Sequence, residues 1–115
     1  MADPEQIVCD VAEGSVPGSG GMRRRVVFSG DRMMVAITHL DPGQGWATTR
    51  HPEEELVYVV SGRLEYGDGR VVTAGMLTVN RSLQDHPGKA AGDGVTVLLE
   101  VYAPPVPALR PAAPA

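Results

Sequence analysis

Residues 43–62 read GQGWATTRHPEEELVYVVSG, and this stretch decides how the rest of the chain is interpreted. His51 and Glu55 lie four residues apart at the start of an apolar, β-rich segment. Side chains separated by an even number of residues point to the same side of an extended strand. Imidazole nitrogen and carboxylate oxygen are groups with which proteins bind zinc, iron, manganese or nickel. The stretch therefore predicts a polar site on one face of a strand.

The rest of the chain consists of short runs rich in Val, Leu, Thr and Tyr, separated by turn signals. Pro-Gly, Ser-Gly, Asp-Gly and Ala-Gly pairs recur at short intervals, and no segment shows a helical period over three turns. Many short strands joined by regular turns are typical of a sandwich or a small barrel. The fold class that the sequence predicts is therefore all-β.

The spacing within residues 43–62 resembles the first motif of the cupin superfamily. Gly43, His51, Glu55 and Gly62 fall at the motif's positions, and Thr49 stands where the family has a further histidine. This resemblance implies a double-stranded β-helix, which is a jelly-roll barrel.

Two later segments resemble the cupins as well. Residues 67–86 are similar to the second cupin motif, in which His86 follows Gly75 by eleven residues. Residues 95–105, VTVLLEVYAPP, resemble the last strand and the Pro-rich exit of the barrel. The cupin barrel is therefore expected to cover residues 22–105.

We expect two further segments outside the barrel. Residues 1–21 contain one strand-like run, at residues 6–11, followed by a Gly-rich linker. Residues 106–115 consist mainly of Pro and Ala and are expected to be a disordered tail. A detached strand on a flexible linker favours pairing with a neighbouring subunit, as in similar small cupins, so we expect a homodimer.

The resemblance also implies a metal site. In the family, two histidines and a glutamate from the first motif and one histidine from the second hold a divalent metal. Carried over to this chain, His51, Glu55 and His86 remain as ligands, and this set suits Zn, Fe, Mn, Co or Ni. Thr49 is a poor ligand for such ions, so we expect it to orient a water molecule or to leave space. The alternative is that the three groups bond to one another in a metal-free cavity.

Two other side chains are candidates for catalytic proton transfer. His39 lies on an apolar segment with the parity of Val35 and Ile37, and Asp85 adjoins His86. Either group would be a suitable acid or base if it reached the cavity. The alternatives are a packed, hydrogen-bonded histidine and a turn-forming aspartate.

Five side chains are expected to line the substrate pocket: Thr49, Trp46, Glu53, Tyr58 and Tyr66. Trp46 follows a Pro-Gly turn, where it could cap the barrel mouth over an apolar ligand or pack as part of the core. Glu53 shares the parity of the two site residues that flank it, so on an extended chain it points with them.

Composition limits the class of protein. A length of 115 residues predicts one domain with a core that needs no disulfide, and the single Cys9 suits a reducing cytoplasm. Fourteen acidic residues against ten basic ones give a net charge of -4, which argues against general affinity for nucleic acid. The basic run at residues 23–25 is interpreted as a salt-bridging edge. No apolar run approaches the ~18 residues of a membrane span, so we expect no membrane partner and a cytoplasmic protein. We also expect a small-molecule substrate.

The motif region also resembles a narrower group. A single histidine, a proline and acidic residues that run into LVYVVSG are similar to small cupins that act as cyclases in bacterial aromatic polyketide biosynthesis. That likeness implies that a Lewis-acidic metal polarises a poly-β-ketone while His39 or Asp85 removes an α-proton. A non-haem metal oxygenase is the second interpretation, and a metal-free module that binds a small molecule is the third.

Overall fold

The structure is a computed structural model, and it describes residues 5–11, 21–46 and 50–107. The regular elements of these residues are nine β-strands: β1 (Met22–Ser29), β2 (Met34–Leu40), β3 (Gly45–Trp46), β4 (Glu54–Ser61), β5 (Arg63–Tyr66), β6 (Val71–Thr73), β7 (Leu77–Asn80), β8 (Gly88–Ala90) and β9 (Thr96–Ala103). No described segment forms a helix of the length and apolarity that a membrane crossing requires.

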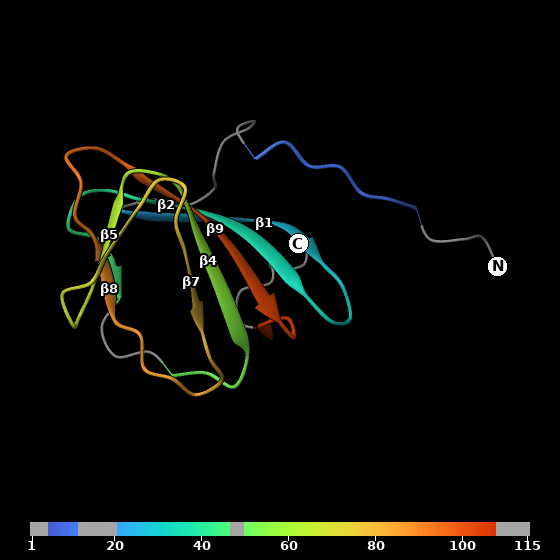
Figure 1. Cartoon of the computed structure of the whole chain (residues 1–115). Helices are drawn as coiled ribbons and strands as arrows, with labels where there is room; N and C mark the ends of the chain where they lie inside the picture. The colour runs from blue at the N-terminus through green and yellow to red at the C-terminus, as the bar shows by residue number, and fades with distance from the viewer. Residues whose placement is uncertain (1–4, 12–20, 47–49, 108–115) are drawn as a thin grey trace.

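The strands form two antiparallel sheets that face one another. One sheet has the order β1-β2-β9-β4-β7 and the other the order β3-β8-β5-β6. Figure 1 shows the larger sheet on one side of the barrel and the strands β5 and β8 on the other. β4 and β9 are far apart in the sequence but are neighbours at the centre of the larger sheet. The structure therefore confirms the expected all-β double-stranded β-helix.

Alternating side chains divide β4 and β9, at the centre of the larger sheet, into an inner and an outer face. The inner residues of β9 are buried, and they are Thr96, Leu98, Glu100 and Tyr102. Leu98 packs in the apolar core, whereas Glu100 and Tyr102 bring polar groups into the barrel nearer the strand's end. β4 follows the same pattern, because Val57 and Val59 are core residues and Glu55, nearer its start, is polar. An apolar core thus fills one end of the barrel and polar side chains gather at the other.

The outer face of the larger sheet is largely apolar. In the middle of β4 and β9, the outward residues are half-buried aliphatic side chains and one tyrosine, Tyr58, whereas Glu54 at the start of β4 is exposed. At the sheet edge, Leu77 and Val79 of β7 are each more than half exposed. This face explains why the sequence of β4 is apolar on both sides. The expected homodimer stays a prediction.

The segment before the barrel differs from the sequence-based expectation. Residues 6–11 form no strand, and the side chains of residues 5–11 are exposed. Contacts between side chains and backbone join this segment to β1, since Cys9 Sγ lies 3.8 Å from the carbonyl oxygen of Val27 and Arg25 donates to the carbonyl oxygen of Asp10 at 3.4 Å. Without a ladder of backbone hydrogen bonds, the β-favouring side chains do not produce a strand.

The segment after the barrel was expected to leave it at residue 106. Pro105 is buried and Val106 is half-buried, so the chain still packs against the barrel there. Residues 108–115 of the predicted tail lie outside the described residues.

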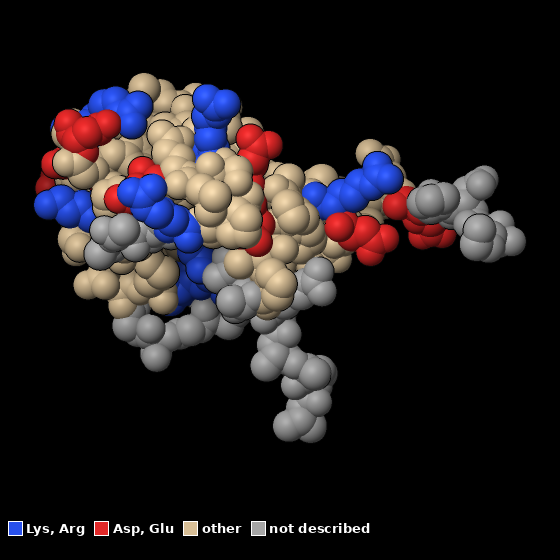
Figure 2. Space-filling model, turned by 90° about the horizontal axis from the view of Figure 1, so that it is seen from below, with Lys and Arg blue, Asp and Glu red and all other residues tan. Residues whose placement is uncertain are grey.

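Charged side chains are mixed over the surface. On the face that Figure 2 shows, Lys and Arg lie among Asp and Glu rather than in a separate basic area. In the basic run, Arg23 pairs with Asp41 at 3.2 Å and Arg24 pairs with Glu100 at 3.3 Å. The run therefore makes salt bridges.

Gly62 provides a test of how tightly the barrel closes. Its φ is +90°, and a Cβ at this position would lie 2.7 Å from Thr96 Cα, whereas Gly75 has φ +88° with no neighbouring atom within 4 Å. We expect Gly75→Ala to lower the free energy of unfolding by about 1–2 kcal/mol through backbone strain. Gly62→Ala should lower it by about 1 kcal/mol more, because the methyl group also overpacks β9. Urea unfolding of both variants measures the difference, and equal losses would contradict the close approach.

Candidate metal centre

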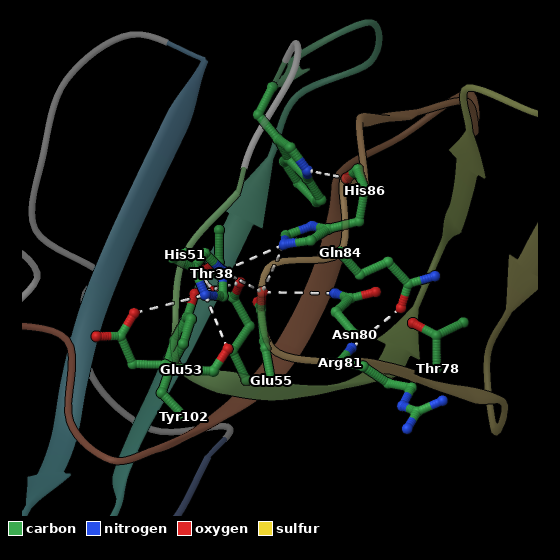
Figure 3. A network of polar contacts seen from close by, with 12 residues as sticks. Thr38, His51, Glu53, Glu55, Thr78, Asn80, Arg81, Gln84, His86 and Tyr102 are labelled. Atoms are coloured by element: carbon green, nitrogen blue, oxygen red, sulfur yellow. Dashed lines mark hydrogen bonds and ion pairs between the residues drawn. The ribbon is translucent and has the colours of Figure 1, made fainter.

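Three side chains from separate segments converge inside the polar end of the barrel. His51 precedes β4, Glu55 lies within β4, and His86 lies in the loop before β8. His51 Nε2 lies 3.1 Å from His86 Nε2 and 3.4 Å from Glu55 Oε1, and His86 Nε2 lies 3.7 Å from the same Oε1 atom. Figure 3 shows the three groups pointing toward one another. The structure thus brings together the three ligands that the sequence predicted.

The separations of these atoms fit a small divalent ion. Ligands about 2.1 Å from a tetrahedrally coordinated ion are about 3.4 Å from one another. The three observed separations, 3.1, 3.4 and 3.7 Å, surround that value. Two imidazoles and one carboxylate also form a donor set that zinc, iron and related ions accept. The residues present therefore fit such a metal in both geometry and chemistry.

Glu53 orients the ring of His51. His51 Nδ1 lies 3.0 Å from the carbonyl oxygen of Glu53 and 3.5 Å from its Oε1 atom. Both partners accept hydrogen bonds, so Nδ1 carries the proton and Nε2 presents a lone pair to the cluster. Glu53 was expected to line the pocket, but it does not. It is buried behind His51, where it fixes the tautomer that can bind a metal.

His86 is held by its backbone. The indole Nε1 of Trp46 donates to the carbonyl oxygen of His86 at 2.5 Å, and the two rings meet edge to face with 6.4 Å between centroids. Burial, together with the nearby His51, lowers the pKa of His86. This histidine is therefore neutral at physiological pH, which is the form that binds metal ions.

Glu55 is a buried carboxyl group with few compensating partners. It is 3 % exposed and accepts a 3.4 Å hydrogen bond from Asn80 Nδ2. Burial, followed by the charge of Glu100, raises the pKa of Glu55 to about 8. At neutral pH Glu55 therefore holds a proton in the metal-free protein, and a metal would have to displace that proton.

A second carboxyl group in the barrel was not predicted from the sequence. Glu100 of β9 is 2 % exposed and accepts hydrogen bonds from Thr38 Oγ1 and, at 2.9 Å, from Tyr102 OH. Arg24 of β1 bonds to it through Nε at 3.3 Å. Although burial opposes the effect, the Glu100 carboxylate raises the pKa of Arg24, which is therefore charged.

The three ligands and this second network line a common cavity of about 250 Å³. Arg24, Glu100 and Tyr102 share its wall with His51, Glu55 and His86. The apolar side chains that complete the lining are Met22, Trp46 and Val106. Trp46 thus lines the cavity that contains the three predicted ligands, and its contact with a substrate stays a prediction.

Other predicted site residues lie elsewhere. His39 was expected to reach the cavity, but its neighbours Thr38 and Leu40 are fully buried, and His39 is half-buried and faces outward between them. Tyr58 likewise lies on the outer face, since Val57 and Val59 fill the interior. Strand alternation groups side chains on one face without saying which face is inside.

Asp85 and Tyr66 line a different space. They lie along a larger groove of about 580 Å³, which His86 also lines. Asp85 Oδ2 lies 3.9 Å from Arg50 Nη2, and Tyr66 OH lies 2.6 Å from Thr78 Oγ1. Neither residue lines the cavity that holds the three ligands. Thr49 lies outside the described residues.

Comparisons with known proteins agree with this architecture. Residues 5–103 match the family described as the ChrR cupin-like domain. None of the curated proteins matches the chain.

Several solved structures have the same fold, and three of them come from bacteria. An uncharacterised double-stranded β-helix protein from Klebsiella pneumoniae is 28 % identical, with a TM-score of 0.76 over 87 % of this chain and 91 % of its own. KdgF from Halomonas sp. is 19 % identical, with a TM-score of 0.75 over 86 % and 95 % of the two chains. An RmlC-like cupin from Shewanella frigidimarina is 19 % identical, with a TM-score of 0.74 over 92 % and 97 %. At such low identities the last two likenesses show the fold alone.

The raised pKa of Glu55 predicts how pH changes the stability of the metal-free protein. Its pKa is about 8 when folded and about 4.3 when unfolded, so the folded state holds the extra proton between these values. The stability from this group is fully present below about pH 4 and is lost as the pH rises through about 8. We therefore expect the free energy of unfolding in chelator to fall between about pH 4 and pH 8 and to level off above that.

Two variants isolate this effect from other titrations. Glu55→Gln should flatten the fall because an amide has no proton to lose, whereas the exposed Glu54→Gln should retain it. Urea unfolding across the pH range measures all three proteins. Parallel curves for Glu55→Gln and the parent would show that Glu55 titrates normally.

Proposed function

We propose that this protein, which belongs to the family of ChrR cupin-like domains, is a metal-dependent enzyme that acts on a small carbonyl compound. The observation that carries the proposal is the triangle of His51, Glu55 and His86, whose ligand atoms lie 3.1–3.7 Å apart at the wall of a cavity. A structural metal site is closed on all sides by protein ligands, whereas three ligands beside a cavity leave a position for substrate.

The chemistry follows from the groups that line the cavity. A bound divalent ion would polarise a carbonyl oxygen and make the neighbouring C–H bond more acidic. Glu100 is the carboxylate of the cavity outside the three ligands, so it is placed to accept the proton when that bond breaks. Tyr102 holds one oxygen of Glu100 at 2.9 Å, which fixes the direction of the carboxylate.

The proton on Glu100 can then return to a different atom, or the enolate carbon can attack a second carbonyl of the same molecule. In that second case the C=O π bond breaks, and the new alkoxide oxygen takes the proton from Glu100. The first course is an isomerisation and the second a cyclisation. Met22, Trp46 and Val106 form the apolar part of the cavity, which suits the carbon skeleton of the substrate.

A more specific form of this proposal is that the substrate is a polyketide and the reaction its cyclisation. The resemblance of residues 43–62 to cupins that act as polyketide cyclases supports it. The cavity volume of about 250 Å³ is below the ~300–1,000 Å³ of common small-molecule sites. This size favours a short carbonyl compound over a long poly-β-ketone. We therefore propose enolisation of a small substrate as the reaction of the site.

A metal-dependent oxygenase is the second candidate. Two histidines and one carboxylate that leave neighbouring positions open form a ligand set that non-haem iron enzymes use for oxygen chemistry. Oxygen uptake by the Fe(II)-loaded protein would favour this candidate. Exchange of α-protons with deuterated water in the absence of oxygen would favour enolisation.

Metal binding can be tested directly on the three histidines of the chain. We expect near-stoichiometric metal in the parent, and a fall in affinity of about 100-fold or more in His51→Ala and His86→Ala, since each loses one ligand. His39→Ala is the matched control, because His39 lies on the outer face. Elemental mass spectrometry after dialysis against Zn²⁺ or Fe²⁺ measures the content.

Two results would overturn the proposed metal function. One is a parent protein that holds no metal after incubation with divalent ions, which would leave the metal-free binding module. The other is equal metal content in His51→Ala and His39→Ala.

A further inference from the structure

Arg24 occupies an unusual place for a charged side chain. It comes from β1, and its register partner on β2 is Thr38, one of the fully buried residues of the barrel. The Arg24 side chain is 24 % exposed and forms part of the wall of the cavity that contains the three predicted metal ligands. Its guanidinium is therefore directed inward, whereas those of Arg23 and Arg25 bond to Asp41 and Asp10.

One edge of this guanidinium is held in place. Arg24 Nε donates to Thr38 Oγ1 at 3.0 Å and to Glu100 Oε1 at 3.3 Å. Glu100 is itself bonded to Thr38 Oγ1 and to Tyr102 OH. A guanidinium has five N–H donors in a planar fork, and Nε supplies one of them. The hydrogen bonds of Arg24 to described residues use Nε alone, which leaves its two Nη groups for a ligand.

A structural salt bridge would not need this arrangement. Replacing a buried ion pair by apolar side chains is often neutral or stabilising, so the pair of the partly buried Arg24 with the buried Glu100 is not explained by stability alone. An arginine whose Nε is fixed and whose Nη groups are unengaged matches the two oxygens of a carboxylate. The three predicted metal ligands in the same cavity would take a further oxygen of that molecule.

We propose that Arg24 binds the carboxylate of the substrate, which is a small oxo acid whose carbonyl oxygen lies toward His51, Glu55 and His86. This inference rests on the proposed function for the placement of the carbonyl group, but the Arg24 contact itself stands on the geometry of the Arg24–Glu100 pair. The cavity volume of about 250 Å³ suits an acid of a few carbon atoms.

The test compares acids with their uncharged esters. Pyruvate and acetoacetate are the probes, and methyl pyruvate and methyl acetoacetate retain their carbonyl groups without the charge. Titration calorimetry on metal-free and Zn²⁺-loaded protein measures the affinities. We expect the acids to bind the parent about tenfold or more tightly than the esters, which corresponds to one charge-assisted pair.

The variants assign that preference to one side chain. Arg24→Gln should remove the preference for acids, and Arg24→Lys should keep part of it, because an ammonium retains the charge without the fork. Arg63→Gln is the matched control, since it removes one exposed positive charge on the other sheet. An acid preference that persists in Arg24→Gln would overturn the proposal, as would equal binding of acid and ester by the parent.

A second measurement needs no variant. In arginine-labelled parent protein, pyruvate should shift the NMR signals of the Arg24 Nη–H groups, and methyl pyruvate should not. Unchanged Arg24 signals at saturating pyruvate would overturn the proposal even if Arg24→Gln failed to fold.

The experiments distinguish failure of the proposed metal function from failure of the proposed role of Arg24. If metal binds and the acid preference does not depend on Arg24, the metal function stands and the substrate assignment is wrong. If acids bind through Arg24 in a protein that never takes up metal, the assignment of Arg24 stands and the metal function is wrong.

Discussion

The burial of two carboxyl groups on the central strands is the constraint on which the site depends. Glu55 of β4 and Glu100 of β9 are both almost fully buried inside the barrel. A charge removed from water is costly unless it is paired and hydrogen-bonded. Glu100 has Arg24, Thr38 and Tyr102 as partners, whereas Glu55 has Asn80 and two histidines. The negative charge of Glu55 is therefore the one that a proton or a metal ion would neutralise.

The sequence predicted those parts of the site that are local. His51 and Glu55 lie in one short stretch whose spacing determines that they meet, and the glycines and turn pairs around it indicate the barrel. His86 was found because a second local motif ends on it. In each case, a few neighbouring residues are enough to identify the ligand positions. The fold then brings the two segments together.

The remaining features depend on strand pairing, which the sequence does not display. Arg24 and Glu100 are 76 residues apart and meet because β1, β2 and β9 lie side by side. His39 shows the converse error, since its parity was identified correctly but the inner face belongs to the alternate residues of β2. One signal was available for Glu100, because it is an acidic residue within the otherwise apolar strand Thr96–Ala103. Such a residue on an apolar strand is costly to bury and therefore indicates a site.

The charges inside the barrel connect the metal with the substrate. With both carboxylates ionised, Glu55 and Glu100 carry two negative charges against the single positive charge of Arg24, so one negative charge is uncompensated. Burial and the charge of Glu100 raise the pKa of Glu55, and a proton on Glu55 would remove this imbalance in the metal-free protein. A divalent ion in place of the proton would leave one excess positive charge in a cavity of low dielectric. A neutral substrate would not remove that excess, whereas a monoanion would, so the charge balance of the metal-loaded barrel favours an acid as its ligand.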